Sequence, residues 1–294
     1  MSWLWELKTC GANEDISDGG VYFKKLTLDS QVSGYIAAAR REGHDVKGVV
    51  YDVVSKTGLR PTGKGAETPE SYEARIIAQI AAEPERYYQR GIIVRTEAEL
   101  EEHAADVWGI SQNILAARNS GRWPRQVGGC FAFNRPCDYW ETCANGAPID
   151  GPLYKTEARY KHRLTVLSNS AMQSWRQCPR KCQYSNEMNR VPITTGFDAR
   201  GFGAMMHMAI QDWHMRGDLE DTLKKLRFVD GASPHDVAHA RALTRGYAAR
   251  WADAKFKVIE VEREYIHALE YDGETSTSFV LGGRVDGIVE EVGQ

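Results

Sequence analysis

Acidic and basic side chains that could carry out hydrolytic chemistry stand close together near the start of the chain. Glu6 and Lys8 are two residues apart in the apolar run Trp3–Thr9, which predicts a short strand. Because side chains alternate along a strand, Glu6 and Lys8 share one face. A carboxylate there can hold a divalent metal ion while the ammonium orients a water molecule or a phosphate oxygen. A single Glu-x-Lys pair is also common on exposed strand faces.

Two further candidate ligands stand far along the chain. Asp286 is at the centre of the apolar run Leu281–Val289, where a carboxylate is costly unless it is paired or binds metal. An ion pair with Arg284 is the structural alternative. His207 lies in the run Gly201–Ile210, which predicts a helix of small residues. Imidazole is a common ligand for Mn²⁺-type sites, although a lone histidine on an apolar helix face is often a hydrogen-bonded core residue.

Strands and helices alternate in the elements that must position these groups. Caps and apolar spacing predict helices from Asp29 or Ser30 to Arg41, from Pro69 onward, from Thr96 to Arg118, and over Ser168–Gln177, Phe202–Arg216 and His235–Ala254. Further strands are predicted at Lys47–Val54, Tyr87–Arg95, Lys257–Leu269 and Ser278–Glu290. A loop rich in cysteine and aromatic residues is expected at 122–145, and a linker at 146–165. The pattern predicts an α/β fold.

Gln31 and Tyr35 lie on the predicted helix that follows the Glu-x-Lys strand. Their spacing of four residues puts both side chains on one helix face. From that face both could form hydrogen bonds to the phosphates of a substrate.

Composition limits the class of protein. The 294 residues are 42% hydrophobic and 26% charged, and the net charge is −3. We expect a cytoplasmic protein, because no apolar run is long enough to cross a bilayer and the first residues lack a signal-peptide pattern. The negative charge counts against a passive nucleic-acid coat protein. It does not count against a nuclease, where bound cations supply the positive charge.

The chain has six cysteines, at positions 10, 130, 137, 143, 178 and 182. In a reducing compartment, clustered cysteines are metal ligands more often than disulfides. The spacing of Cys130, Cys137 and Cys143 is wider than the Cys-x-x-Cys of zinc ribbons. Iron–sulfur, zinc and free thiols are the three alternatives.

Together these motifs resemble the RecB-like branch of the PD-(D/E)xK nucleases, which includes CRISPR-adaptation exonucleases, AddB-type helicase-nucleases and many phage exonucleases. The family order is a Cys-Pro helix, a Gly-xxx-His helix, an Asp strand, a Glu-x-Lys strand, a Gln-xxx-Tyr helix and a cysteine cluster. The matching residues are Cys178-Pro179, Gly203…His207, Gly283-Arg284-Val285-Asp286, and then Glu6…Lys8, Gln31…Tyr35, Cys130, Cys137 and Cys143.

This order is restored only when residue 294 is joined to residue 1, so the chain looks circularly permuted. The resemblance implies a restriction-endonuclease-like core, a mixed central sheet flanked by helices, with an iron–sulfur-stapled helical segment. Residues 166–294 would form the first half of one nuclease domain and residues 1–145 the second half. The two catalytic strands could pair within one chain or between two chains in a domain swap. An artefact of sequence assembly is the remaining alternative.

The resemblance also implies roles for the residues. Asp286 and Glu6 would be catalytic and would bind Mg²⁺ or Mn²⁺ together with His207, and Lys8 would be the catalytic lysine. Gln31 and Tyr35 would bind the substrate.

A [4Fe–4S] cluster is implied at Cys130, Cys137, Cys143 and Cys178, with Cys182 as a possible substitute ligand.

By the same resemblance, the protein is expected to be a DNA exonuclease. It would act on DNA ends or single strands in recombination, repair or phage replication, alongside recombination or helicase proteins. A non-catalytic iron–sulfur DNA-binding or assembly module is the alternative. A zinc-stabilised interaction protein is a second one.

Overall fold

The computed structural model describes residues 2–63, 67–132, 135–158, 160–193, 196–254 and 256–291. The chain forms two compact units. The first comprises Met1–Arg95, Gly196–Arg263 and Arg284–Gln294, and the second comprises Thr96–Thr195 and Glu264–Gly283. The two long C-terminal strands contribute residues to both units, β9 from Phe256 to Tyr271 and β10 from Glu274 to Glu291.

A mixed sheet forms the centre of the first unit. Its strands follow the order β3 (Tyr88–Ile93), β2 (Val46–Ser55), β1 (Ser2–Cys10) and β10, and β9 pairs with β10. The β1 and β2 strands are parallel, whereas β3 runs antiparallel to β2 and β10 runs antiparallel to β1. The sheet is built mainly from runs of apolar residues, and most of β2 is buried.

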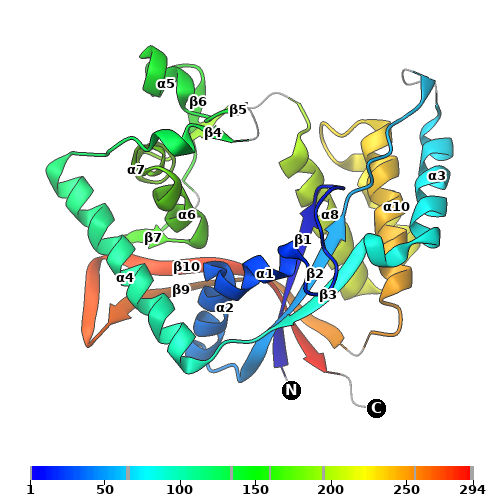
Figure 1. The fold of residues 1–294 in the computed structure, drawn as a ribbon, viewed down its shortest axis with the longest axis horizontal. Coiled ribbons are helices and arrows are strands. Elements are labelled where there is room, and N and C mark those ends of the chain that lie inside the picture. The colour runs from blue at the N-terminus through cyan, green and yellow to red at the C-terminus, as the bar shows by residue number, and fades with distance from the viewer. Residues whose placement is uncertain are drawn as a thin grey trace. The chain divides into compact units, whose positions relative to one another are not determined.

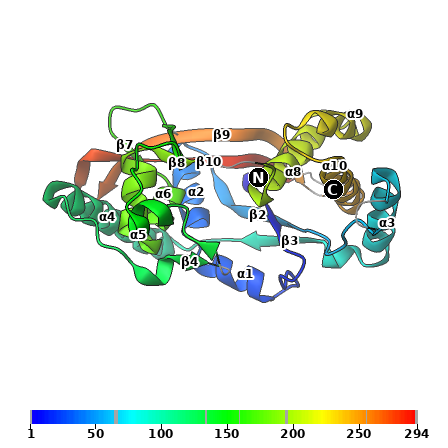
Figure 2. The ribbon, with the colours of Figure 1, turned by 90° about the horizontal axis from the view of Figure 1, so that it is seen from above.

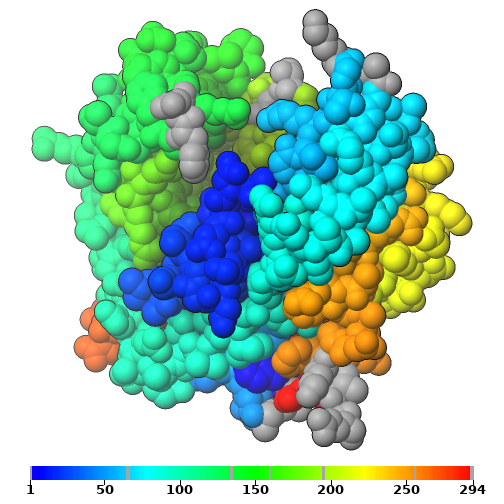
Figure 3. Space-filling model, turned by 45° about the vertical axis from the view of Figure 1, so that its right-hand side comes forward, coloured from blue at the N-terminus to red at the C-terminus, as the bar shows by residue number. Residues whose placement is uncertain are grey.

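Helices of the first unit cover this sheet. They are α1 (Val21–Lys25), α2 (Ser30–Arg41), α3 (Pro69–Ala82), α8 (Ala199–Arg216), α9 (Leu219–Lys225) and α10 (Pro234–Arg250). Figures 1 and 2 show α3, α8 and α10 on the same side of β1–β3. Their apolar residues form one core with Trp5 and Leu7 of β1. The packing of α3 (cyan) against α10 (yellow to orange) is visible in Figure 3.

A buried ionic network joins four elements of the first unit. Asp52 of β2 is 0% exposed, and its carboxylate accepts hydrogen bonds from Arg90 of β3 at 2.6 and 2.7 Å. It also accepts from the Trp5 indole of β1 at 3.0 Å and from the Tyr247 hydroxyl of α10. A buried carboxylate is tolerated when its oxygens are satisfied in this way. The network therefore fixes β1, which carries Glu6 and Lys8.

Local capping fixes the two helices that carry candidate site residues. Asp29 caps α2 by accepting from the backbone N–H of Gln31 at 2.7 Å. Asp198 caps α8 by accepting from two backbone N–H groups of its first turn. Gly217 ends α8 with a φ of 72°, a conformation that favours glycine.

The second unit combines short helices, short strands and the middle of the β9–β10 hairpin. Its helices are α4 (Glu97–Ser120), α5 (Trp140–Asn145), α6 (Asn169–Gln177) and α7 (Pro179–Cys182), followed by a π-helix at Gln183–Glu187. Its strands are β4 (Phe131–Ala132), β5 (Arg135–Pro136), β6 (Tyr154–Thr156), β7 (Thr165–Leu167) and β8 (Arg190–Pro192). The β7 strand pairs in parallel with residues 279–281 of β10.

Apolar residues of α4 and α6 form a separate core in the second unit with Phe279. Arg118 of α4 is held beside this core by Glu187 and lies over the Phe279 ring at 4.8 Å. The second unit therefore has its own hydrophobic core.

Most elements predicted from the sequence are confirmed, including the capping box at Thr96 and the caps at Asp29 and Ser168. The loop predicted at 122–145 contains more structure than expected, namely β4, β5 and α5. Part of the predicted linker 146–165 is also ordered, because Tyr154 is buried, stacks on Tyr139 at 5.4 Å and begins β6. The mixed sheet flanked by helices fits the predicted restriction-endonuclease-like core. The assignment of residues 1–145 and 166–294 to one nuclease domain stays a prediction.

No helix in the described part of the chain is long and apolar enough to cross a membrane.

Candidate active site

The candidate site begins where the ladder between β1 and β10 ends. The two strands are paired from Ser2 with Glu290 to Trp5 with Gly287. The backbone N–H of Leu7 then donates to a side chain, Asp286 Oδ2, at 2.9 Å. The carboxylate of Asp286 is thereby fixed next to the Glu-x-Lys segment.

Gly287 permits close packing at this point of the ladder. A Cβ atom at this position would lie 2.6 Å from the backbone oxygen of Glu260 and 3.1 Å from the Trp5 ring. Any larger residue would push β10 away from its neighbours, so the glycine beside Asp286 helps to set the position of β10.

Glu6 is a buried carboxylate with one satisfied oxygen. Its side chain is 1% exposed, and Oε1 accepts from Lys8 Nζ and from Gln31 Nε2, the latter at 3.0 Å. Its other oxygen, Oε2, has no hydrogen-bond partner among the residues that the structure describes. Burial and the nearby Asp286 carboxylate raise the pKa of Glu6 to about 8, although Lys8 opposes this shift. A cation beside Oε2 would relieve this unfavourable burial.

Lys8 is the cation that the sequence supplies at this position. Burial by itself lowers the pKa of Lys8, but the carboxylates of Glu6 and Asp286 outweigh it and raise the pKa above the ordinary value. Its side chain is 32% exposed, so its ammonium is both charged and partly accessible. These are the properties that a group contacting a phosphate or a water molecule needs.

His207 faces Asp286. Its Nδ1 lies 3.5 Å from Asp286 Oδ2, and the two side chains are 24% and 14% exposed. Burial lowers the pKa of His207 despite the nearby Asp286 carboxylate. The imidazole is therefore neutral at neutral pH, which is the form that binds metal ions. The sequence predicted this meeting of α8 with the Asp286 strand only through the resemblance.

Gln31 and Tyr35 also lie at this site. Gln31 Nε2 donates to Glu6 Oε1 and to the Tyr35 hydroxyl, at 3.0 and 2.5 Å. Tyr35 is buried, with 7% exposure. Gln31 thus contacts Glu6 directly and Tyr35 contacts Gln31, and the role of the two residues in binding substrate stays a prediction.

The alternative partner considered for Asp286 is engaged elsewhere. Arg284 forms an ion pair with Glu262 of β9, with Nε and Oε2 2.7 Å apart. The alternative that Asp286 forms an ion pair with Arg284 is therefore wrong.

The side-chain types at the site, as distinct from their present spacing, suit a hard divalent cation. Within the described ranges, no three His, Cys, Asp or Glu side chains are grouped closely enough to hold a metal ion. The oxygens of Glu6 and Asp286 and the nitrogen of His207 are nevertheless the ligand types that Mg²⁺ and Mn²⁺ accept. The unpartnered Glu6 Oε2 points to the same class of ion.

Four cysteines line one cavity of the second unit. The cavity has a volume of about 240 Å³, and its lining includes Cys130, Cys137, Cys143 and Cys178. Arg125, Arg180 and Lys181 also line it, so cationic side chains accompany the thiols. Cys182 is not part of the lining, and its Sγ lies 3.8 Å from the backbone oxygen of Ala171. Cys10 belongs to the first unit and is not part of the lining.

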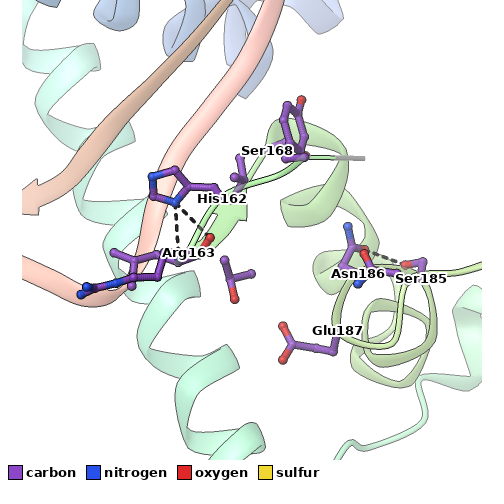
Figure 4. Close-up of a pocket in the computed structure, with 11 residues that line it drawn as sticks. His162, Arg163, Ser168, Ser185, Asn186 and Glu187 are labelled. Carbon is purple, nitrogen blue, oxygen red and sulfur yellow. Dashed lines mark hydrogen bonds between the residues drawn. The ribbon is translucent and has the colours of Figure 1, made fainter. Parts of the chain in front are cut away.

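A second cavity in the same unit was not anticipated from the sequence. It has a volume of about 200 Å³ and lies between the segment 160–168 and the π-helix region (Figure 4). Ser185, Asn186 and Glu187 line one wall, while His162 and Arg163 line another. No motif marks these residues, because their polar character is ordinary for a surface loop.

The mixed sheet flanked by helices fits a restriction-endonuclease-like fold. Residues 166–294 match the family model of the PD-(D/E)XK nuclease superfamily. The matched segment contains His207 and Asp286, and it supports placing the chain in that superfamily. Members of that superfamily are nucleases that generally use Mg²⁺ or Mn²⁺ and act on DNA. Neither the curated proteins nor the solved structures include a significant match to the chain.

Proposed function

We propose that this protein is a metal-dependent DNA exonuclease that hydrolyses phosphodiester bonds at DNA ends or in single strands. Recombination, repair and phage DNA processing are the settings in which such an activity acts, with recombination or helicase proteins as partners. The observation that supports the proposal is the meeting of Glu6, Lys8 and Asp286 at the open end of the β1–β10 ladder. Glu6 and Lys8 are two residues apart in the sequence and about 280 positions before Asp286, and their meeting resembles the pattern of the superfamily.

Each residue has a defined task in this mechanism. A Mg²⁺ or Mn²⁺ ion held by Asp286, Glu6 and His207 would lower the pKa of a bound water and neutralise the scissile phosphate. Lys8 holds the nucleophilic water or a phosphate oxygen through its accessible ammonium. Gln31 orients Glu6 by donating to its Oε1. The neutral imidazole of His207 lies beside Asp286 and has one ring nitrogen without a proton, which can bind a metal ion.

The test is degradation of end-labelled single-stranded DNA in the presence of Mn²⁺. Wild type is expected to release labelled nucleotides, and Lys8→Ala is expected to release none while remaining folded. Lys25→Ala is the matched control, because Lys25 is exposed and its ammonium contacts the exposed Glu14 and the Tyr22 ring rather than the candidate site. A covalently closed circular single strand distinguishes an exonuclease, which leaves the circle intact, from an endonuclease. Binding of DNA without cleavage by wild type would favour the non-catalytic module instead.

We also propose that Cys130, Cys137, Cys143 and Cys178 hold a [4Fe–4S] cluster. The support is that all four line one cavity, and thiolates are the usual ligands of such clusters. Anaerobically purified protein is expected to be brown, with iron and sulfide in equal amounts. Cys178→Ser is expected to lose the colour, whereas Cys182→Ser, outside the cavity lining, keeps it. A colourless protein with stoichiometric zinc would show the zinc-stabilised interaction protein.

The order of the catalytic elements is proposed to be a circular permutation of the family order. The support is the register of β1 and β10, since Ser2 pairs with Glu290 in the antiparallel geometry of a hairpin. Pairing within one chain also makes a domain swap unnecessary for assembling the site. A monomer in solution that cleaves DNA is the expected result, and activity confined to a dimer would contradict it.

A further inference from the structure

Glu262 has a backbone conformation that its residue type disfavours. It lies within β9 and has a φ of +55°. Among the described residues, the other non-glycine residues with positive φ are Asn189 and Asp272. Asparagine and aspartate tolerate this region because their short side chains bond locally, whereas glutamate does not. A strained residue inside a strand calls for a compensating role.

The carboxylate of Glu262 is bound on both oxygens. Gln211 Nε2 of α8 donates to Oε1 at 2.7 Å. Arg284 Nε of β10 lies 2.7 Å from Oε2. With both oxygens engaged, Glu262 is placed to hold its neighbours rather than to bind a metal ion itself.

Both partners of Glu262 stand next to candidate metal ligands on their own elements. Gln211 is four residues after His207, one turn further along α8. Arg284 is two residues before Asp286, on the same side of β10. Glu262 therefore connects the helix that carries the imidazole with the strand that carries the carboxylate. It does so close to the contact between His207 and Asp286, whose nearest atoms are 3.5 Å apart.

We propose that Glu262 is a positioning residue that sets the spacing of His207 and Asp286 for a divalent cation. This inference rests on the proposed function, because it takes His207 and Asp286 to be ligands. Outer residues that orient metal ligands typically contribute 10- to 100-fold to metal affinity. Glu262 has a positive φ, and its side chain reaches Gln211 and Arg284. These two contacts offset the cost of the strained backbone conformation.

The decisive variant is Glu262→Gly, which removes the carboxylate and also relieves the backbone strain. Calorimetric titration with Mn²⁺ in the absence of DNA is expected to show affinity reduced by about tenfold or more. The melting temperature of the metal-free variant is expected to equal or exceed that of wild type, because exposed ion pairs contribute little to stability. Glu264→Ala, an exposed glutamate two residues further along β9, is the matched control and keeps wild-type affinity.

A merely structural role would lower the melting temperature and the Mn²⁺ affinity together, and that result would overturn the inference. Unchanged Mn²⁺ affinity in Glu262→Gly would overturn it as well.

Gln211→Ala provides an independent check. If Glu262 acts through Gln211, each single variant weakens Mn²⁺ binding, and the double variant is weaker by less than the product of the two effects. If the two losses of Mn²⁺ affinity simply multiply in the double variant, Glu262 does not act through Gln211.

The readout also separates the two proposals. If the wild type binds Mn²⁺ but cleaves no DNA, the proposed exonuclease activity is refuted. The role of Glu262 is then decided by the Mn²⁺ affinities of wild type and Glu262→Gly alone. Asp286→Ala must abolish this Mn²⁺ binding, and binding that survives it would refute the metal site and the inference together.

Discussion

Glu6→Gln is expected to stabilise the metal-free protein and to abolish its stabilisation by metal ions. The Glu6 side chain is 1% exposed, Oε2 has no hydrogen-bond partner, and burial raises its pKa from 4.5 to about 8. A neutral amide of nearly the same shape avoids the cost of burying this charge. It also removes the carboxylate that we propose as a metal ligand.

The size of the effect follows from the difference in pKa between the folded and unfolded chain. A carboxyl group whose pKa is raised on folding leaves stability intact below pH 4.5 and reduces it as the pH rises towards 8. Each pKa unit corresponds to about 1.4 kcal/mol, so the reduction at pH 7 is about 3 kcal/mol. Glu6→Gln loses the ion pair with Lys8 in return, which makes this value an upper limit.

Urea unfolding in EDTA at pH 7 and pH 5 measures the free energy of unfolding of both proteins. The variant should be more stable at pH 7, and the difference should shrink at pH 5. Mn²⁺ at a hundredfold excess over its Kd should stabilise wild type by about 3 kcal/mol and leave the variant unchanged. Glu102→Gln, an exposed residue of α4, is the control and should change neither quantity. A variant that is less stable in EDTA, or equally stabilised by Mn²⁺, would refute this account of Glu6.

Three further predictions concern stability. Asp52→Asn breaks a buried pair with Arg90 and should cost about 3 kcal/mol, seen as a lower urea midpoint; an unchanged midpoint would contradict the role given to this network. His239 has a pKa lowered by burial to about 4, and its Nε2 accepts from the Thr57 N–H. The unfolded chain therefore takes up a proton first, and stability should fall as pH drops from 6.5 towards 4, by at most about 2 kcal/mol at pH 5; His239→Gln should flatten this urea-measured profile. Gly246→Ala should lower the melting temperature, because its Cβ would clash with the Tyr88 hydroxyl of β3; an unaltered melting temperature would show that α10 can shift away from Tyr88 at no cost.

Elements with strong local signals were predictable from the sequence. The Thr96–Glu99 capping box, the Asp29 cap and the apolar strand around Val50 all formed where local chemistry places them. The same holds for the shared face of Glu6 and Lys8, since strand alternation requires no knowledge of the fold.

Contacts between distant segments were not predictable from composition or spacing. The network around Asp52 joins four elements, and nothing in the run Val46–Ser55 shows that its acid is buried. Glu262 was missed for the same reason, because its positive φ depends on partners on α8 and β10. The meeting of His207 with Asp286 was reached only through a family resemblance, which summarises long-range contacts that a single sequence does not show.

The position of the candidate catalytic residues just past one end of the β1–β10 ladder explains why the site need not depend on a turn between these strands. Ser2 and Glu290 form the outermost pair, whereas Glu6 and Asp286 lie beyond the inner end at Trp5 and Gly287. Bringing together residues 279 positions apart, as in the Leu7–Asp286 hydrogen bond, costs about 3 kcal/mol more than closing a loop of about ten residues. That cost falls on stability and on the folding rate, because non-local pairs form late. The spacing of Glu6 and Asp286 is set by the ladder register, by Gly287 against Trp5 and by the Leu7 hydrogen bond, all of which are the same whichever way the chain connects the two strands.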